Sequence, residues 1–345
     1  MNDAFVTPRL TGAPMARFHG HPGYRRMFAP ERLTLGLFLP LRFYQGRMEV
    51  LTGQADLAST IDRLGFAAVW VRDVPLYDPS FGDAGQVFDP FTYLAFLAAR
   101  TQNVALATGS AIFTLRHPID LAKAAASLDR LSGGRLVMGI ASGDRPIEFP
   151  AYGIDRAQRG ERFAEAVRCF RQLLGPGPLT LDSPLGRFTG AQLLPDPATG
   201  GIPLIVTGSS GQSLEWIAEH ADGWLTYPDA THNERGPQHL AEKIRAWREL
   251  IRDGGFRPHM TNEWLDLVDD PDYPRTPLQG GYVLRTGRKG LLDLLERWQA
   301  AGVNHAALGI QHSQRPPTEV IQELAEEVLP HFPSLPGPPA LPSDW

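Results

Sequence analysis

An arginine and an aspartate stand side by side after a short apolar run, and they are the first residues that could do chemistry. Arg72 and Asp73 directly follow GFAAVWV. At the mouth of a pocket, a guanidinium and a carboxylate could orient a substrate or move a proton. The same two side chains could instead form a salt bridge that closes the mouth of the fold. The sequence leaves both interpretations open, so Arg72 and Asp73 are catalytic candidates.

A second group of candidates lies in the segment TGSAIFTLRHPID. Ser110 and Ala111 follow Gly109, and these small residues would let a flat molecule approach the backbone closely. Arg116 and His117 then precede a proline, which fits the first position of a helix. Arg116 could hold an anion or pair with a carboxylate. His117 could act in catalysis or simply end the loop as a cap-like residue.

The best candidate for an anion site is the turn in VTGSSGQSLEW. Gly208, Ser209, Ser210, Gly211 and Gln212 lead directly into a predicted helix. Free amide hydrogens and two hydroxyls would converge there at the positive end of the helix, so a phosphate is the natural guest. An ordinary serine-capped helix would have the same pattern.

The segment LSGGRLVMGIASGDR has glycines at both ends of an apolar run. It lacks the spacing G-x-G-x-x-G between a strand and a helix, so it is not a dinucleotide fingerprint. Gly133 and Gly134 are expected to end a helix and turn the chain into a buried strand at Leu136–Ala141. Ser142 and Gly143 then place a hydroxyl and an open backbone at the far end of that strand. Only this far end is expected to be functional.

A rhythm of helix, glycine turn and short apolar run repeats along the chain. Runs this short and this uniformly apolar are typical of parallel strands that are buried on both faces. We predict eight strands, at Leu33–Leu41, Ala67–Val71, Val104–Gly109, Leu136–Ala141, Pro203–Thr207, Gly223–Tyr227, within Glu263–Val268, and Ala306–Ile310. The predicted helices are Gly53–Leu64, Pro90–Arg100, Pro118–Leu131, Gly160–Leu174, Ser213–Ala221, Pro237–Asp253, Lys289–Ala301 and Pro317–Leu329.

Eight such units predict an α/β fold, the (β/α)8 TIM barrel, and a doubly wound sheet is the alternative. Two long segments rich in proline and glycine, 175–201 and 269–287, are expected as insertions after the fourth helix and around the seventh strand. We expect an N-terminal arm over 1–32, a single catalytic domain over 33–330 and a proline-rich tail over 331–345.

Composition narrows the class of protein. The 345 residues carry 33 basic and 38 acidic side chains, a formal charge of −5 with no basic run, so nucleic acid is not an expected partner. There is no long apolar segment and no secretory signal pattern, so we expect a cytoplasmic protein with no membrane association. The single cysteine, Cys169, lies in a helical apolar pattern and is expected to pack in the core rather than react. No Walker loop for binding nucleotide phosphates is present. There is also no HExxH motif and no other spacing typical of metal ligands.

These segments together resemble the bacterial luciferase-like flavin-dependent monooxygenase superfamily. The resemblance is carried by LGLFLP, GFAAVWVRD, TGSAIFTLRHPIDLAKAAASLDRLSGGRLVMGIASGD and VTGSSGQSLEWIAEHADGWLTY, in this order. It extends roughly from Leu33 to Ile310. Its most specific part runs from His117–Pro118 through Gly134–Arg135 to Gly143.

The resemblance implies a TIM barrel that binds FMN or, in one branch, the deazaflavin F420. It implies a non-proline cis peptide under the flavin, near Ser110–Ala111 in this chain. It also implies that Ser142–Gly143 and Ser209–Gln212 hold the flavin phosphate. Luciferases proper have a Glu-His-His run after strand two where this chain has Arg72-Asp73-Val74, so luciferase chemistry on an aldehyde is not expected here.

Three hypotheses follow from the resemblance. The first is a two-component monooxygenase that uses reduced FMN and O2 on a small organic substrate, with a separate flavin reductase as partner. Phe38, Phe43, Tyr44 and Phe113 would form its apolar wall, although core packing fits Phe38 better. The second is an F420-dependent oxidoreductase that transfers hydride. The third is a non-catalytic flavin-binding protein. A homodimer is left open, in which the N-terminal arm would wrap a partner.

Overall fold

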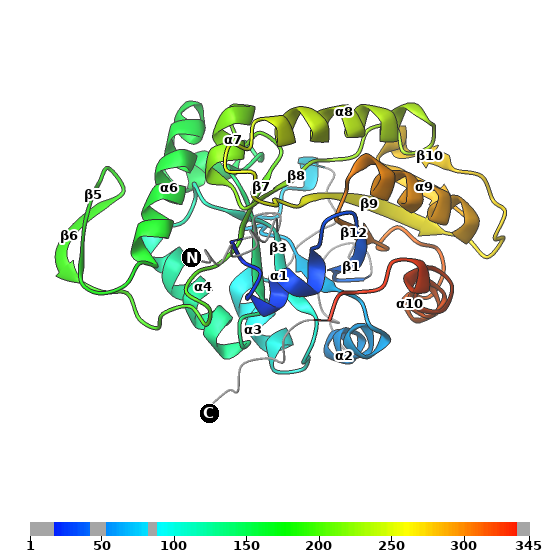
Figure 1. The fold of residues 1–345 in the computed structure, drawn as a ribbon, viewed down its shortest axis with the longest axis horizontal. Coiled ribbons are helices and arrows are strands. Elements are labelled where there is room, and N and C mark those ends of the chain that lie inside the picture. Colours follow the sequence, from blue (N-terminus) through cyan, green and yellow to red (C-terminus); the bar gives the residue numbers. More distant parts are fainter. Residues whose placement is uncertain (1–16, 42–52, 82–87, 337–345) are drawn as a thin grey trace, which may run out of the picture.

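Eight parallel strands close into a barrel in the computed structural model, which describes residues 17–41, 53–81 and 88–336 (Figure 1). Around the barrel these strands are β1 (Thr34–Leu39), β2 (Ala68–Val71), β3 (Ala105–Ile112), β4 (Leu136–Ala141), β7 (Leu204–Thr207), β8 (Gly223–Leu225), β9 (His259–Leu267) and β12 (His305–Gly309). The barrel closes because β12 pairs with both β1 and β9, and β9 also pairs with β8. The predicted TIM barrel is therefore confirmed.

Helices follow the strands and flank the barrel (Figure 1). They are α2 (Gln54–Leu64), α3 (Pro90–Ala98), α4 (Pro118–Leu131), α6 (Arg159–Leu173), α7 (Leu214–His220), α8 (Arg235–Glu249), α9 (Arg288–Ala301) and α10 (Pro317–Glu323). A four-residue helix, α5 (Glu148–Ala151), lies between β4 and α6. No helix among the described residues is both long and apolar enough to cross a membrane.

The two faces of each strand contribute to two different parts of the core. In β1, every residue is buried. Leu35, Leu37 and Leu39 belong to the large cluster that includes the apolar faces of the helices. Phe38 belongs to a second cluster together with Trp70 and other side chains of the barrel interior. Burial on both faces explains why these strands appear in the sequence as continuous apolar runs.

The arginine of the Gly-Gly-Arg motif has a structural role. The guanidinium of Arg135 donates hydrogen bonds to the carbonyls of Ala98, Thr101, Ser132 and Val104 at 2.9–3.1 Å. Burial lowers its pKa to about 10. One buried side chain thus connects the ends of α3 and α4 to the start of β3, at the end of the barrel where the strands begin.

Part of the expected N-terminal arm closes that same end of the barrel. Helix α1 (Pro22–Met27) is capped by His21, whose Nδ1 accepts the amide of Tyr24 at 3.2 Å. The amide of Gly23 donates to the carbonyl of Gly134 at 3.0 Å. A Cβ at Gly23 would lie 2.5 Å from the carbonyl oxygen of Arg135, so only glycine allows this close approach.

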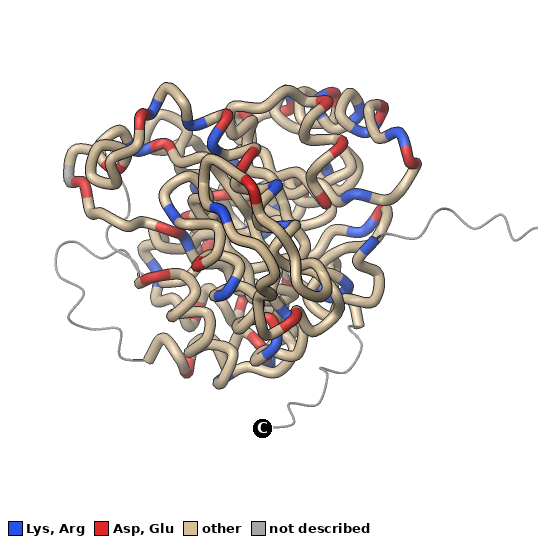
Figure 2. Tube along the Cα trace, turned by 90° about the vertical axis from the view of Figure 1, so that its left-hand side faces the viewer, with Lys and Arg blue, Asp and Glu red and all other residues tan. Residues whose placement is uncertain are grey.

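Both predicted insertions are present. The first is the antiparallel hairpin β5 (Leu179–Ser183) and β6 (Gly186–Ala191) after α6. The second contains β10 (Thr276–Leu278), a 3-10 turn (Gln279–Gly281) and β11 (Val283–Thr286), which pairs in parallel with β9. The seventh barrel strand, β9, begins before the predicted segment and is wholly buried. Acidic and basic residues are interspersed over the trace in Figure 2.

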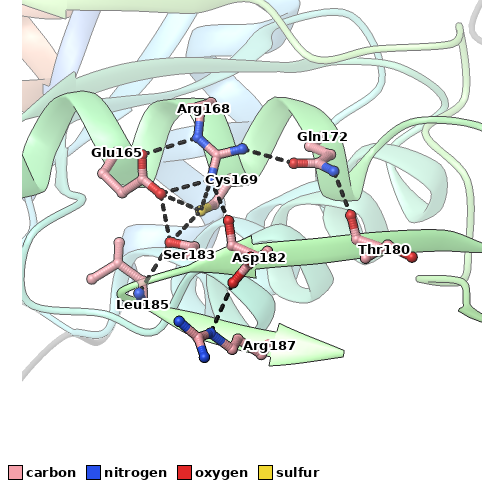
Figure 3. A network of polar contacts seen from close by, with 9 residues as sticks. All are labelled: Glu165, Arg168, Cys169, Gln172, Thr180, Asp182, Ser183, Leu185 and Arg187. Carbon is pink, nitrogen blue, oxygen red and sulfur yellow. Dashed lines mark hydrogen bonds and ion pairs between the residues drawn. The ribbon is translucent and has the colours of Figure 1, made fainter. Parts of the chain in front are cut away.

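A polar network fixes the first insertion to α6 (Figure 3). Arg168 pairs with Glu165 and donates to the carbonyl of Asp182 in β5 at 3.2 Å. Ser183 donates to Glu165 at 2.6 Å. Cys169 is a buried member of this network, with its Sγ 3.2 Å from the hydroxyl of Ser183, and burial raises the pKa of its thiol. The prediction that Cys169 packs rather than reacts agrees with both observations.

Candidate active site

A pocket of ≈ 770 Å³ opens at the carboxyl ends of the barrel strands. Its walls come from residues at the ends of β1, β2, β3, β4, β7 and β8, from β9, and from the second insertion. Its volume falls in the range of small-molecule sites, and in TIM barrels this end of the strands carries the functional loops. No group of three or more metal-binding side chains was found in the described part of the chain.

One side of the pocket is a cradle of serine and glycine. Ser142, Gly143, Gly208, Ser209 and Ser210 all line it, as the sequence predicts. Three of them have positive φ angles, 84° at Gly143, 57° at Gly208 and 48° at Ser210. This conformation turns the backbone sharply after β4 and after β7. Two hydroxyl-bearing turns from neighbouring strands therefore converge on one region.

The other two predicted residues of this turn do not line the pocket. A Cβ at Gly211 would lie 2.9 Å from the Cα of Gly160, so Gly211 allows the turn to touch α6. Gln212 donates from Nε2 to the carbonyl of Gly160 at 2.8 Å. Gly211 and Gln212 therefore position the cradle from outside, and Ser213 rather than the cradle serines caps α7.

A ledge of small residues lies at the end of β3. The structure has a non-proline cis peptide between Gly109 and Ser110, one residue earlier than the resemblance implies. A Cβ at Gly109 would lie 2.9 Å from Phe38, so a larger residue would not fit. The hydroxyl of Ser110 contacts that of Thr207 at 2.5 Å and so connects the ledge to the cradle. Ala111 is fully buried and does not line the pocket.

Asp73 forms the salt bridge that the sequence left open as an alternative. It lines the pocket, yet its carboxylate accepts two hydrogen bonds from Arg116, at 2.7 and 3.2 Å, and one from the amide of Ile112 at 3.0 Å. Arg116 also pairs with Asp89 at 3.1 Å. Burial alone would lower the pKa of Arg116, but these partners outweigh it and raise the pKa. Arg116 itself does not line the pocket.

Arg72 does line the pocket. Its guanidinium lies 5.6 Å from the ring centroid of Trp264, which is cation–π geometry. Burial lowers its pKa. The adjacent candidates Arg72 and Asp73 thus have different surroundings, and only Arg72 contacts an aromatic wall.

His117 lies outside the pocket and caps α4. Its Nδ1 accepts the amide of Ile119 at 3.2 Å. We expect His117→Ala to lower the free energy of unfolding by about 0.5–2 kcal/mol, the usual cost of losing an N-cap. Denaturant unfolding measures this effect. Flavin affinity is expected to stay unchanged, and a loss of affinity without a loss of stability would contradict the capping role.

The opposite wall of the pocket was missed by sequence reasoning. Trp264 stacks on Phe38 with ring centroids 5.4 Å apart and an interplanar angle of 30°, and the ring centroid of Tyr282 lies 6.0 Å from that of Trp264. Two buried polar residues, Asn262 and Glu263, line the pocket beside them. In the sequence, the only sign of this wall is the pair of polar residues Asn262 and Glu263 within a buried strand. The same pair makes the strand hard to recognise, because it interrupts the apolar run.

The predicted aromatic wall is partly corrected. Phe38 lines the pocket as well as packing in the barrel interior. Phe113 does not line it, because its ring packs against Phe163 and Phe170 in the core between the barrel and the helices. Phe43 and Tyr44 lie outside the described residues.

The model of the luciferase-like monooxygenase family matches residues 33–259. This is more than half of the chain, so the protein belongs to that family. The chain is similar to 4-hydroxyprotoasukamycin monooxygenase of Streptomyces nodosus subsp. asukaensis, with 32% identity over 52% of this chain and 48% of that protein. It is also similar to an F420-dependent hydroxymycolic acid dehydrogenase of Mycobacterium tuberculosis, with 30% identity over 57% of this chain and 54% of that protein.

Among solved structures, the fold is similar to the oxygenating constituent of 3,6-diketocamphane monooxygenase from Pseudomonas putida in complex with FMN. The TM-score is 0.69 at 16% identity, covering 88% of this chain and 99% of that one. The first curated relatives are matched over about half to two thirds of their own length. Of these similar proteins, one is named as an F420-dependent dehydrogenase and another was solved in complex with FMN.

The residues of the pocket fit a flavin-type cofactor. A phosphate needs hydroxyls and free amides, which the cradle of Ser142, Gly143 and Gly208–Ser210 supplies. A flat ring needs a support that it can approach closely, and Gly109 lines the pocket with backbone alone. A buried oxygen of Asn262, Oδ1, has no hydrogen-bond partner within the described protein, so it is available to a ligand donor.

Proposed function

We propose that this protein is a monooxygenase that uses reduced FMN and O2 to oxidise a small organic substrate. The observation that carries the proposal is the convergence of Ser142–Gly143 and Gly208–Ser210 on one side of a pocket whose next wall is the Gly109 ledge. The family match adds the class of chemistry. When bound, reduced FMN supplies two electrons to O2, so that one oxygen atom enters the substrate and the other leaves as water.

The residues of this chain bind, orient and shield in that reaction. The cradle would hold the phosphate through Ser142, Ser209 and neighbouring amides. The ledge would support the ring, while Phe38, which packs against the ledge, and Trp264, which stacks on Phe38, would keep water from the adjoining wall. Arg72, above Trp264, would orient the substrate. Asp73 and Arg116 hold β2 and β3 together and so position the ledge rather than touch the substrate.

One cofactor site is proposed in the described barrel. Reduced FMN would therefore come from a separate flavin reductase. We further propose that the protein works in the cytoplasm, binds neither nucleic acid nor membrane, and can form a homodimer. These proposals rest on the sequence and on the family.

The alternative is an F420-dependent enzyme that transfers hydride, favoured by the 30% identity to an F420-dependent dehydrogenase. Incubation with photoreduced FMN, ¹⁸O2 and a panel of small ketones, phenols and amines separates the two. We expect ¹⁸O in a product. Reduction of F420 by a panel of alcohols under anaerobic conditions, with no ¹⁸O product from FMN, would establish the alternative and contradict the proposal. A protein that binds FMN yet converts nothing in either panel would be the non-catalytic flavin-binding protein.

A further inference from the structure

Glu263 is a buried carboxyl group in the pocket wall that the proposed function does not yet use. Its side chain is almost completely buried and lines the pocket. Oε1 accepts a hydrogen bond from the amide of Trp264 at 3.1 Å, whereas Oε2 has no hydrogen-bond partner among the described residues. No ion pair to Glu263 occurs among the described residues. A buried polar oxygen without a partner costs free energy unless a ligand satisfies it.

The strand order separates Glu263 from the proposed cofactor contacts. In the closed barrel, β9 lies four strands from β3 in either direction. The Gly109 ledge is on β3, and the serine and glycine cradle follows β4 and β7. The cradle strands β4 and β7 lie three and two strands from β9. A cofactor centred on the ledge and the cradle would therefore lie mainly on the other side of the pocket from Glu263, which leaves the β9 wall open to another molecule. That wall also includes Trp264, Thr231 and the turn at Gln279–Gly281.

We propose that Glu263 is a substrate-binding residue that donates a hydrogen bond from its neutral carboxyl group to an acceptor oxygen of the substrate, such as a ketone or amide carbonyl. The inference rests on the proposed function, because it places the substrate opposite the cofactor. It adds a substrate class, a neutral molecule with a carbonyl oxygen, and assigns a specificity-determining residue.

The protonation of Glu263 follows from its surroundings. Burial raises the pKa of the carboxyl, the nearby side chain of Thr231 and the amide of Trp264 lower it, and the result is about 8. The protonated form is therefore favoured at pH 7. A protonated carboxyl is a hydrogen-bond donor, which a carboxylate is not. The carbonyl oxygen of a ligand, which has no proton of its own, is its complement.

The test compares two probes of nearly equal shape, acetophenone and α-methylstyrene, which differ by a C=O in place of a C=CH2. Ligand-observed NMR on the full chain loaded with oxidised FMN gives both dissociation constants. For the unaltered protein we expect acetophenone to bind about threefold to tenfold more tightly, the range of one net hydrogen bond. Equal affinity for the two probes would overturn the proposal without any variant.

Three variants assign the preference to Glu263. Glu263→Gln keeps a neutral hydrogen-bond donor and should retain most of the preference for acetophenone. Glu263→Leu removes the donor and should reduce it to less than twofold. The matched control is Glu148→Gln, because Glu148 is also a fully buried carboxyl with a pKa raised to about 7 and does not line the pocket. It should keep the full preference. A Glu263→Leu protein that still prefers acetophenone contradicts the assignment.

FMN affinity, measured on the same proteins, keeps the two proposals apart. We expect the dissociation constant of FMN to change less than twofold in the Glu263 variants. If Glu263→Leu instead loses FMN while the probes are unaffected, Glu263 contacts the cofactor and the substrate assignment fails. If the unaltered protein does not bind FMN at all, the proposed function fails, and the probe comparison on the unloaded protein still tests Glu263.

Discussion

Replacing Gly143 with valine is expected to weaken FMN binding at least tenfold while the barrel stays folded. Gly143 has φ 84° at the end of β4, and a Cβ there would lie 3.0 Å from Ile112 Cγ2 and 3.3 Å from Phe149 Cζ. A valine must therefore move either its own backbone or both neighbours, and the backbone belongs to the cradle. Quenching of flavin fluorescence gives the dissociation constant.

Gly153→Val is the matched control for this experiment. Gly153 also has a positive φ angle, 66°, but nothing lies within 4 Å of a Cβ there, and it does not line the pocket. Both variants carry the cost of about 1–2 kcal/mol for a side chain in the left-handed region. Only Gly143→Val should lose FMN. Equal FMN affinity in the two variants would mean that the turn after β4 does not contact the cofactor.

Replacing Asp73 with alanine is expected to lower the free energy of unfolding by about 2–4 kcal/mol. The change leaves the guanidinium of Arg116 without its main partner and the buried amide of Ile112 without an acceptor. Because the pair joins β2 to the end of β3, FMN affinity should also fall as the ledge loosens. Denaturant unfolding and flavin quenching measure the two effects.

The control for Asp73→Ala is Asp89→Ala. Asp89 is the second partner of Arg116, and it is 43% exposed. It also caps α3, so Asp89→Ala should cost about 1 kcal/mol, the value of a cap and an exposed ion pair. FMN affinity should be unchanged in this variant. If Asp73→Ala is no less stable than Asp89→Ala, the buried pair is not what holds the ledge.

Most of the architecture could be predicted from local patterns. Strands that are buried on both faces, such as β1, give continuous apolar runs, and prolines at first helical positions mark the starts of α3, α4 and α10. The cradle could also be predicted, because turns with positive φ angles favour glycines, and Gly143 and Gly208 stand directly after predicted strands.

The remaining features depend on contacts between distant segments. β9 contains Asn262 and Glu263, so its pattern is not that of a buried strand, although its neighbours bury it completely. The capping role of His117 and the pairing of Arg116 with Asp73 depend on geometry that residue types do not encode. Trp264 reaches Phe38 partly because Gly309 leaves room for the indole, since a Cβ there would lie 2.2 Å from its ring. That relation joins β9 to β12 and has no local signal.

Binding of FMN, riboflavin and F420 to the purified protein tests the central claim most directly. FMN and riboflavin differ only by the phosphate, which the cradle of Ser142, Gly143 and Gly208–Ser210 is proposed to hold. Flavin fluorescence quenching is expected to give micromolar affinity for FMN, at least tenfold weaker binding of riboflavin, and weaker binding of F420 than of FMN. Equal affinity for FMN and riboflavin, or a clear preference for F420, would contradict the account.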